Sequence, residues 1–370
     1  MAKSVVHSQC GGYTLSVPNV QSLATSLDKS TQIPERYVRP EANADPIART
    51  NEIELPVIDL AKLIDPEFSK EEAAKLHRTC QEWSFFQLVN HGVTEELIEG
   101  LKANTVEFFN KPLEEKMVYK QDNDGTLQGY GQAFVLSEEQ KLDWSDMFYV
   151  TTRPVALRNM KFWPTSPSTF RDNMDRYSLE LTKLASCLWQ YIATNLGVAP
   201  EVFEQLFKDH PQGLRFNYYP PCPEADKVIG ISPHSDATGF SLLLQINDVQ
   251  GLQIRKDGEW IAVSALPNAL IVNLGDITEV LSNGIYKSIE HRGMTNTQHP
   301  RISLVAFHGP DNSLMLRPLP EVVGDTTTKK IISTGSLVPV FKKTGTNNKS
   351  WHFRNCQIYY LVPVFLKNRY

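Results

Sequence analysis

Beyond His210 the chain consists of short runs of alternating apolar and polar residues, and this pattern limits the fold more than any other feature of the sequence. Such runs span residues 241–245, 252–255, 270–273 and 302–307, and turn-forming residues separate them. Strands that recur every roughly 8–12 residues with turn signals between them are typical of all-β sandwiches and barrels. The pattern therefore predicts a small β barrel or jelly roll.

The N-terminal half of the chain has helical periodicity instead. Apolar residues from Met174 to Leu196 recur at helical spacing until Gly197, and Thr94 offers a hydroxyl that can cap a following helix. The expected elements are strands at 54–60 and 85–89, helices at 70–83, 94–110, 174–196 and 200–208, and a glycine-rich loop at 125–131. Since neither repeats nor a long flexible linker are visible, we expect the helices to pack against the β region as one unit.

Composition narrows the class of protein. The 37 basic and 42 acidic residues balance closely, which argues against nucleic acid or an anionic membrane surface as a partner. The five cysteines are scattered and odd in number, so neither a disulfide framework nor a zinc finger is indicated. No apolar run is long enough to span a membrane, and no hydrophobic leader follows the N-terminus. We expect a monomeric, cytoplasmic protein that acts on a small molecule.

A His-x-Asp pair and a distant histidine stand out within the β region. His234 and Asp236 are two residues apart, so on one strand both side chains would face the same side. His291 would come from another strand. Any one of these histidines alone is more often structural than a ligand. Together, two histidines and a carboxylate form the triad that holds Fe(II) and leaves open positions for oxygen chemistry. A zinc hydrolase with the same three ligands is an alternative.

A second alternating pair lies ten residues beyond His291. Arg301 and Ser303 begin an apolar strand and would both point into the barrel. An inward guanidinium needs an anion, and Arg with Ser is suited to the far carboxylate of a dicarboxylate bound at the metal. Asn217 and Tyr219 also share one face of a strand and offer neutral donors. This second anchor indicates a 2-oxoglutarate-dependent iron oxygenase, because a hydrolase does not require it.

Several motifs in order strengthen this interpretation. They include Asp-Trp-Ser-Asp at 143–146, Asn-Tyr-Tyr-Pro-Pro-Cys at 217–222 and His-Ser-Asp at 234–236, together with residues 33–37, 56–59, 83–92, 291–292 and 301–303. With these the chain resembles the plant 2-oxoglutarate- and Fe(II)-dependent dioxygenases. The resemblance implies a mainly β fold with flanking helices, in which a double-stranded β-helix, or jelly roll, follows an N-terminal α/β region.

The resemblance also implies roles for individual residues. His234, Asp236 and His291 would bind Fe(II). Arg301 and Ser303 would bind the C5 carboxylate of 2-oxoglutarate with help from Tyr219, and Asn217 would lie near this cosubstrate. O2 is the other cosubstrate, succinate and CO2 are the by-products, and ascorbate is the expected reductant. His91, in an Asn-His-Gly turn, is structural in the family.

Within the family the chain is most similar to the branch of senescence-related dioxygenases, norcoclaurine-synthase-like proteins and codeine or thebaine O-demethylases. That branch implies hydroxylation or O-demethylation of an aromatic specialised metabolite such as an alkaloid or flavonoid. Phe134 and Phe307 are candidates for stacking on such a substrate. Ordinary core packing explains either side chain equally well.

The last part of the chain departs from the family pattern. Residues 331–370 contain no amphipathic helix of useful length where the family has a helix that closes the pocket. One hypothesis is an altered reading frame, a retained intron or an unusual splice form. An alternative function follows, namely an isoform that binds metal and 2-oxoglutarate with weak or no turnover. The predicted divisions are an arm and helix at 1–53, an α/β region at 54–205, the dioxygenase core at 206–325 and an atypical tail at 326–370.

Overall fold

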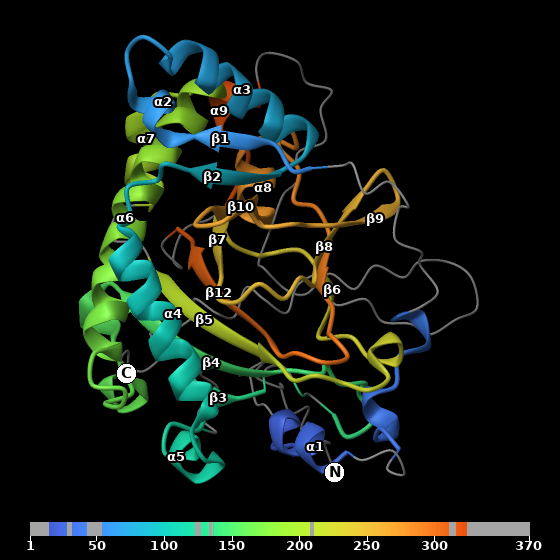
Figure 1. Ribbon diagram of the computed structural model, residues 1–370. Coiled ribbons are helices and arrows are strands. Elements are labelled where there is room, and N and C mark those ends of the chain that lie inside the picture. The colour runs from blue at the N-terminus through green and yellow to red at the C-terminus, as the bar shows by residue number, and fades with distance from the viewer. Residues whose placement is uncertain are drawn as a thin grey trace, which may run out of the picture.

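Two β-sheets form the centre of the computed structural model (Figure 1). The structure describes residues 15–27, 32–42, 54–122, 127–132, 135, 137–207, 211–310 and 316–323. The eight-stranded sheet has the order β1 (Val57–Asp59), β2 (Phe85–Val89), β10 (Leu270–Leu274), β7 (Phe240–Gln245), β12 (Arg301–His308), β5 (Gln212–Tyr219), β4 (Asp146–Arg153) and β3 (Gly129–Gly131). The four-stranded sheet has the order β6 (Ile231–His234), β11 (His291–Gly293), β8 (Leu252–Lys256) and β9 (Glu259–Ala262).

The pairing of the strands is almost entirely antiparallel. Only β1 and β2 run parallel among the described strand pairs. Apolar residues from both sheets pack together, among them Leu243 and Ile271 from the large sheet and Leu252 and Ile254 from the small one. Side chains that alternate along each strand therefore meet between the sheets. This arrangement is the mainly β, jelly-roll fold that the sequence predicts.

Helices cover the outer face of the eight-stranded sheet (Figure 1). The longest, α6 (Phe170–Asn195), buries one stripe of apolar residues, including Met174, Leu181 and Leu188, in the main core. The others are α1 (Val20–Ser26), α2 (Leu60–Ile64), α3 (Ser69–Glu82), α4 (Glu95–Asn110), α5 (Leu113–Met117), α7 (Pro200–Phe207), α8 (Asp276–Leu281) and α9 (Pro320–Val323). Because strands β1 and β2 join the same sheet as the later strands, the N-terminal region and the β core share one hydrophobic core.

The local signals in the sequence correspond closely to these elements. The Thr94 hydroxyl accepts a hydrogen bond from the Leu97 backbone N–H and caps α4. Gly197 follows α6 with a φ of 72°, a left-handed conformation that favours glycine. The predicted loop at 125–131 is partly wrong, since Gly129–Gly131 forms β3. A Cβ on Gly129 would lie 2.6 Å from the Tyr119 carbonyl oxygen, so this glycine permits the segment after α5 to pass close to β3.

One expectation about the candidate site needs correction. His234 ends β6, so Asp236 lies just beyond the strand and does not share it. The chain turns there because the carbonyl oxygen of Asp236 accepts a hydrogen bond from the Asp276 N–H at the start of α8. The segment after β6 is thereby attached to α8 instead of continuing the sheet.

The N-terminal arm, defined as residues 15–27 and 32–42, packs beside β3 and β4 (Figure 1). The Asp146 carboxylate accepts hydrogen bonds from the backbone N–H groups of Val20 and Gln21, at 3.0 and 2.8 Å. The Tyr37 and Trp144 rings meet edge to face with centroids 5.1 Å apart. The arm is thus attached to the residues that lead into β4.

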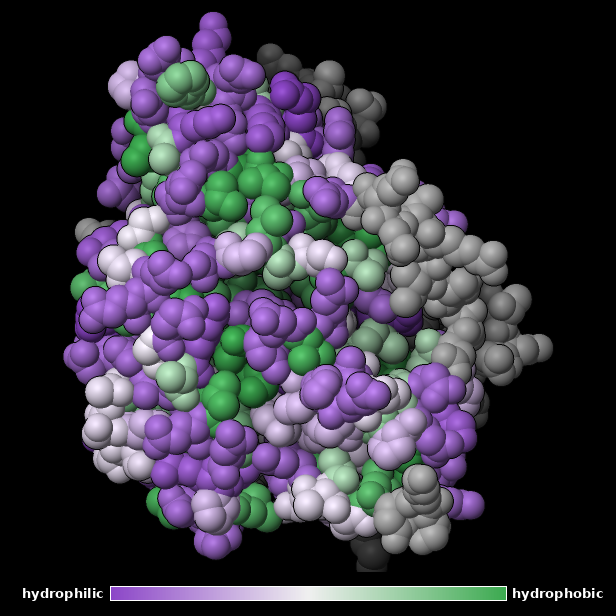
Figure 2. Space-filling model, in the orientation of Figure 1, coloured by the Kyte–Doolittle hydropathy of each residue, from purple (hydrophilic) through white to green (hydrophobic). Residues whose placement is uncertain are grey.

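The face of the molecule seen in Figure 2 is mostly hydrophilic, and hydrophobic side chains gather in its recesses. Among the helices that the structure describes, none has the length and apolar character needed to cross a membrane. Phe134 and the atypical segment 326–370 lie outside the described residues.

Candidate active site

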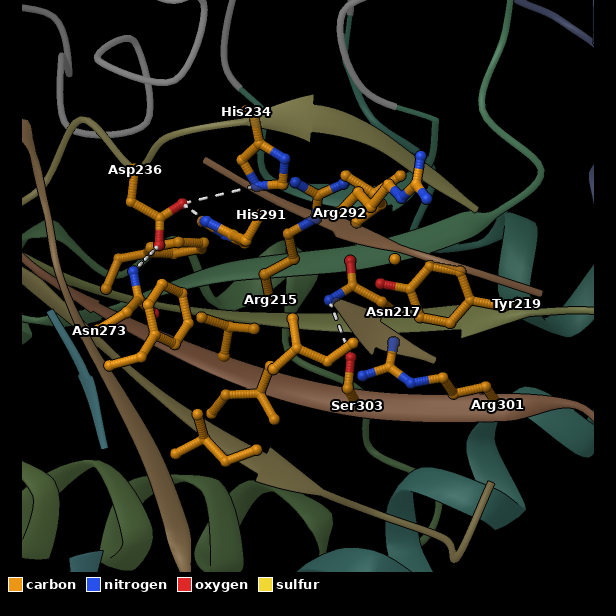
Figure 3. A pocket seen from close by; sticks show the side chains of 18 residues that line it. Arg215, Asn217, Tyr219, His234, Asp236, Asn273, His291, Arg292, Arg301 and Ser303 are labelled. Atoms are coloured by element: carbon orange, nitrogen blue, oxygen red, sulfur yellow. Dashed lines mark hydrogen bonds and ion pairs between the residues drawn. The ribbon is translucent and has the colours of Figure 1, made fainter. Parts of the chain in front are cut away.

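A pocket opens between the two sheets, and its walls carry nearly all of the residues singled out by the sequence (Figure 3). Strands β5 and β12 supply alternating side chains to it, since Arg215, Asn217 and Tyr219 face the pocket from one strand and Arg301 and Ser303 from the other. The remaining lining residues are Phe85, Ile231, His234, Asp236, Leu243, Leu252, Ile271, Asn273, His291, Arg292, Gly293, Val305 and Phe307.

Three potential metal ligands converge on one side of this pocket. Asp236 Oδ1 lies 3.7 Å from the Nε2 of His234 and 3.7 Å from the Nε2 of His291. One ligand atom from each residue lies within 4.8 Å of the others, and no second such cluster occurs among the described residues. Two imidazole nitrogens and one carboxylate oxygen are the donor set of non-haem Fe(II) oxygenases.

Two hydrogen bonds fix the Asp236 carboxylate through the oxygen that faces away from the histidines. Asn273 donates to Oδ2 at 2.8 Å and the Ser241 hydroxyl donates to the same oxygen at 2.5 Å. Oδ1 therefore remains directed at the two histidines (Figure 3). Burial by itself raises the pKa of this carboxyl, but His291, His234 and the two hydrogen bonds outweigh it, so the pKa of Asp236 lies below its usual range. The carboxylate is thus ionised, as a metal ligand must be.

His234 is fixed in one tautomer. Its Nδ1 lies 2.7 Å from the carbonyl oxygen of Ser232, and because a carbonyl only accepts hydrogen bonds, Nδ1 carries the proton. The lone pair then lies on Nε2, which faces Asp236. Burial, together with the neighbouring His291, lowers the pKa of His234 to about 3. A neutral imidazole with an exposed Nε2 lone pair is ready to bind a metal.

The other end of the pocket carries a buried guanidinium. Arg301 is 1% exposed and lies over the Tyr219 ring, with the guanidinium carbon 4.9 Å from the ring centroid. Its terminal nitrogen donates a long hydrogen bond of 3.3 Å to Gln245. Asn217 donates at 3.4 Å to the Ser303 hydroxyl, which lies on the same face of β12 as Arg301. A cation and a hydroxyl thus lie side by side across the pocket from the histidines (Figure 3).

Two buried polar atoms at this end lack a partner among the described residues. They are Nε of Arg301 and Oδ1 of Asn217. No carboxylate of the described chain forms an ion pair with Arg301 either. A buried guanidinium is costly unless an anion compensates it. The arrangement therefore fits a ligand with a carboxylate at this end and a metal-binding group at the other.

Family models match most of the described chain. The N-terminal model for non-haem dioxygenases in morphine synthesis matches residues 55–166, and the model for the 2OG-Fe(II) oxygenase superfamily matches residues 211–310. The chain belongs to the 2OG-Fe(II) oxygenase superfamily. This oxygenase is accordingly a 2-oxoglutarate-dependent oxidoreductase that uses Fe(II), and the donor set in the pocket suits that metal.

Relatives agree with this assignment. The oxygenase is 50% identical to 2-oxoglutarate-dependent dioxygenase 11 of Oryza sativa subsp. japonica, over 85% of this chain and 89% of that protein. It is 43% identical to oxoglutarate-dependent flavonoid 7-O-demethylase 1 of Ocimum basilicum, over 89% and 87%. Identity to thebaine 6-O-demethylase of Papaver somniferum is 40%, over 92% and 96%.

A solved structure supports the fold as well. The crystal structure of JOX2 in complex with 2OG, Fe and JA superposes with a TM-score of 0.77 at 36% identity. The match covers 86% of this oxygenase and 90% of that chain.

The pocket contains more polar residues than sequence reasoning identified. Eight of the nine candidates line it, namely His234, Asp236, His291, Arg301, Ser303, Asn217, Tyr219 and Phe307, and the ninth, Phe134, is not described. His91 is absent from the lining and bonds instead to the Asn268 carbonyl at 2.8 Å. Arg215 was missed, although it precedes Asn217 by two residues on β5 and so shares its face. Asn273 and Arg292, which also line the pocket, carried no comparable signal, and neither did Ser241, which bonds to Asp236 from outside the lining.

Proposed function

We propose that the enzyme hydroxylates or O-demethylates an aromatic specialised metabolite of the alkaloid or flavonoid kind. Two relatives whose names state an O-demethylase activity, on thebaine and on flavonoids, support this substrate class. The pocket also offers apolar and aromatic walls, including Phe85, Leu243 and Phe307, against which a planar ring can pack.

We assign the residues of the pocket as follows. His234, Asp236 and His291 hold Fe(II). Arg301 and Ser303 bind the C5 carboxylate of 2-oxoglutarate, Tyr219 supports the guanidinium, and Asn217 lies beside the same cosubstrate. The observation that carries the assignment is the buried Arg301 guanidinium, which lacks a carboxylate partner in the described chain and faces the three ligand atoms across one pocket.

The protein groups supply charge balance and geometry. With iron and 2-oxoglutarate bound, the site supplies O2 activation coupled to conversion of 2-oxoglutarate into succinate and CO2, with one oxygen atom entering the substrate. Asp236 compensates metal charge, and Arg301 compensates the cosubstrate carboxylate. His234 and His291 each offer a ring nitrogen to the metal, and apolar residues such as Phe85 and Leu243 line the same pocket. A C–H bond of the substrate becomes C–OH, and at an O-methyl carbon the resulting hemiacetal loses formaldehyde.

Product analysis tests the proposal. The purified full-length protein is incubated with Fe(II), ascorbate, 2-oxoglutarate and O2 together with a panel of aromatic alkaloids and flavonoids. Substrate-stimulated succinate with a hydroxylated product, or with formaldehyde from a methoxylated substrate, is the expected result. Succinate that no aromatic compound stimulates, with clear stimulation by a non-aromatic compound, would contradict the substrate class. Binding of metal and 2-oxoglutarate with no turnover of any compound would favour the inactive isoform.

A further inference from the structure

A carboxylate outside the pocket is linked to the metal-ligand strand. Asp143 accepts a hydrogen bond at 3.1 Å from the backbone N–H of Ser232, and the Ser232 hydroxyl donates to the same carboxylate oxygen. The hydroxyl in turn accepts a hydrogen bond of 2.8 Å from Nη1 of Arg39, which also lies 3.5 Å from Asp143. Arg39 belongs to the N-terminal arm, and its side chain is only 12% exposed. Ser232 is therefore held through both its main chain and its side chain.

The residue held in this way orients His234. The Ser232 carbonyl is the group that accepts the Nδ1 proton of His234 at 2.7 Å. A histidine that ligates a metal is oriented by the partner of its other ring nitrogen. A shift of Ser232 would therefore turn the His234 ring or release its tautomer.

The second histidine has a looser partner. The Nδ1 of His291 lies 3.4 Å from the Ile289 carbonyl oxygen, and the ring contacts Phe85 edge to face with centroids 5.3 Å apart. A hydrogen bond of this length is weak. Of the two imidazoles, His234 therefore has the more defined orientation, and its orientation depends on residues outside the pocket.

We propose that Asp143 and Arg39 are positioning residues, which hold His234 through Ser232 in the orientation and tautomer that bind the metal. This inference rests on the proposed role of His234 as an iron ligand. It also gives a function to the Asp-Trp-Ser-Asp motif at 143–146, whose last residue, Asp146, fastens the start of α1. The N-terminal arm then contributes to the metal site without touching it.

Arg36 provides a matched control for Arg39. It lies on the same arm and donates to the segment before Asp143, at the carbonyls of Ser137 and Gln140, and neither of these hydrogen bonds involves Ser232. Loss of Arg36 should loosen the arm without affecting His234. Loss of Arg39 should loosen the arm and also disturb the orientation of His234.

Metal titration separates a positioning role from a merely structural one. Full-length apoprotein of the wild type and of the variants Asp143→Ala, Asp143→Asn, Arg39→Ala, Arg39→Lys and Arg36→Ala is titrated with Co(II), and the visible spectrum reports both affinity and ligand geometry. We expect Asp143→Ala and Arg39→Ala to weaken Co(II) binding by about tenfold or more and Arg36→Ala by less than about twofold. The conservative variants Asp143→Asn and Arg39→Lys should retain part of the Co(II) affinity that the alanine variants lose. Affinity of the Co(II)-saturated protein for 2-oxoglutarate should be unchanged, since Arg301 lies on a different strand.

Two results would overturn the inference. One is wild-type Co(II) affinity and spectrum in both Asp143→Ala and Arg39→Ala, and the other is an equal loss in Arg36→Ala and Arg39→Ala. If Asp143→Ala does not fold by circular dichroism, Asp143→Asn and Arg39→Lys decide by the same criteria. Wild-type protein that binds neither Co(II) nor Fe(II) would overturn the proposed function itself, which distinguishes the two failures.

Discussion

His234 and His291 stand directly opposite each other in the antiparallel pairing of β6 with β11, and their ring centroids lie 4.2 Å apart. In the same way Arg301 stands opposite Tyr219, and Ser303 opposite Asn217, in the pairing of β12 with β5. Side chains opposite each other on paired strands have a fixed separation. Because a slip of one residue would turn a side chain to the other face, strand register alone brings most of the site together.

Removal of the shared carboxylate tests the metal site. We expect Asp236→Ala to weaken Fe(II) binding by more than about a hundredfold, since it removes the only negatively charged ligand of the three. Anaerobic titration of the apoprotein measures this. Asp172→Ala is the matched control, because the Asp172 side chain is 73% exposed on α6. Retention of wild-type affinity by Asp236→Ala would show that the triad is assigned wrongly.

The cosubstrate anchor can be tested independently of the metal. Arg301→Ala should raise the 2-oxoglutarate concentration for half-saturation by about tenfold to a hundredfold, because a hydrogen bond to a charged group contributes about 1.5–3 kcal/mol. Fe(II) affinity should not change. Arg176→Ala, on the exposed face of α6, serves as control. An effect of Arg301→Ala on metal affinity alone, with unchanged 2-oxoglutarate dependence, would refute the assignment.

Gly251 offers a way to displace Arg301 without replacing it. A Cβ at this position would lie 2.7 Å from Cδ of Arg301 and 2.6 Å from the Met294 carbonyl oxygen, so neighbouring atoms must move. We expect Gly251→Ala to weaken 2-oxoglutarate binding by about tenfold or more, since small misplacements of binding groups have large effects. Isothermal titration of metal-loaded protein measures it. Gly100→Ala, in α4, should bind 2-oxoglutarate normally, and equal binding by both variants would disprove the expectation.

Substitution of Asn273 tests whether its hydrogen bond orients the Asp236 carboxylate. Asn273→Ala removes one of the two hydrogen bonds to Oδ2 and frees the carboxylate to rotate. We expect metal affinity to fall by about 10–100-fold, the usual effect of removing a group that orients a ligand. Asn195→Ala, which removes a similar amide hydrogen bond from the end of α6 to the Ala73 carbonyl, is the control. If Asn273→Ala and Asn195→Ala have the same metal affinity, Asn273 does not orient the Asp236 carboxylate.

The sequence could group most of the residues that line the pocket because they follow strand alternation. Asn217 with Tyr219 and Arg301 with Ser303 are spaced by two, so a strand assignment suffices to place each pair on one face. The contacts that orient the ligands were not predictable in this way. Asn273 reaches Asp236, and Asp143 reaches Ser232, only through the tertiary fold.

Errors in the predicted elements have similar causes. The sequence predicted a loop at Gly129 and Gly131 because glycine usually marks turns. In the structure they are part of β3, where the backbone of Tyr119 and Gln121 passes too close for a side chain at Gly129. The end of β6 before Asp236 depends on α8, which lies far along the sequence.

Ligand binding should stabilise the fold through Arg301. A ligand present at a hundred times its dissociation constant stabilises the native state by about 2.7 kcal/mol. We expect 2-oxoglutarate with Ni(II) to raise the melting temperature of the wild type by about 3–4 °C. In Arg301→Ala, 2-oxoglutarate with Ni(II) should raise the melting temperature little more than Ni(II) alone does. Equal shifts in the two proteins, measured by differential scanning fluorimetry, would separate Arg301 from cosubstrate binding.

The guanidinium buried at the end of the pocket has a consequence for the life of the protein in a cell. If Arg301 binds 2-oxoglutarate as proposed, the bound metabolite stabilises the native state, so we expect a scarcity of this metabolite to leave a larger fraction of molecules open to proteases. When the metabolite is abundant, the same molecules persist. On this proposal, the abundance of the enzyme as well as its rate would follow the supply of its own cosubstrate.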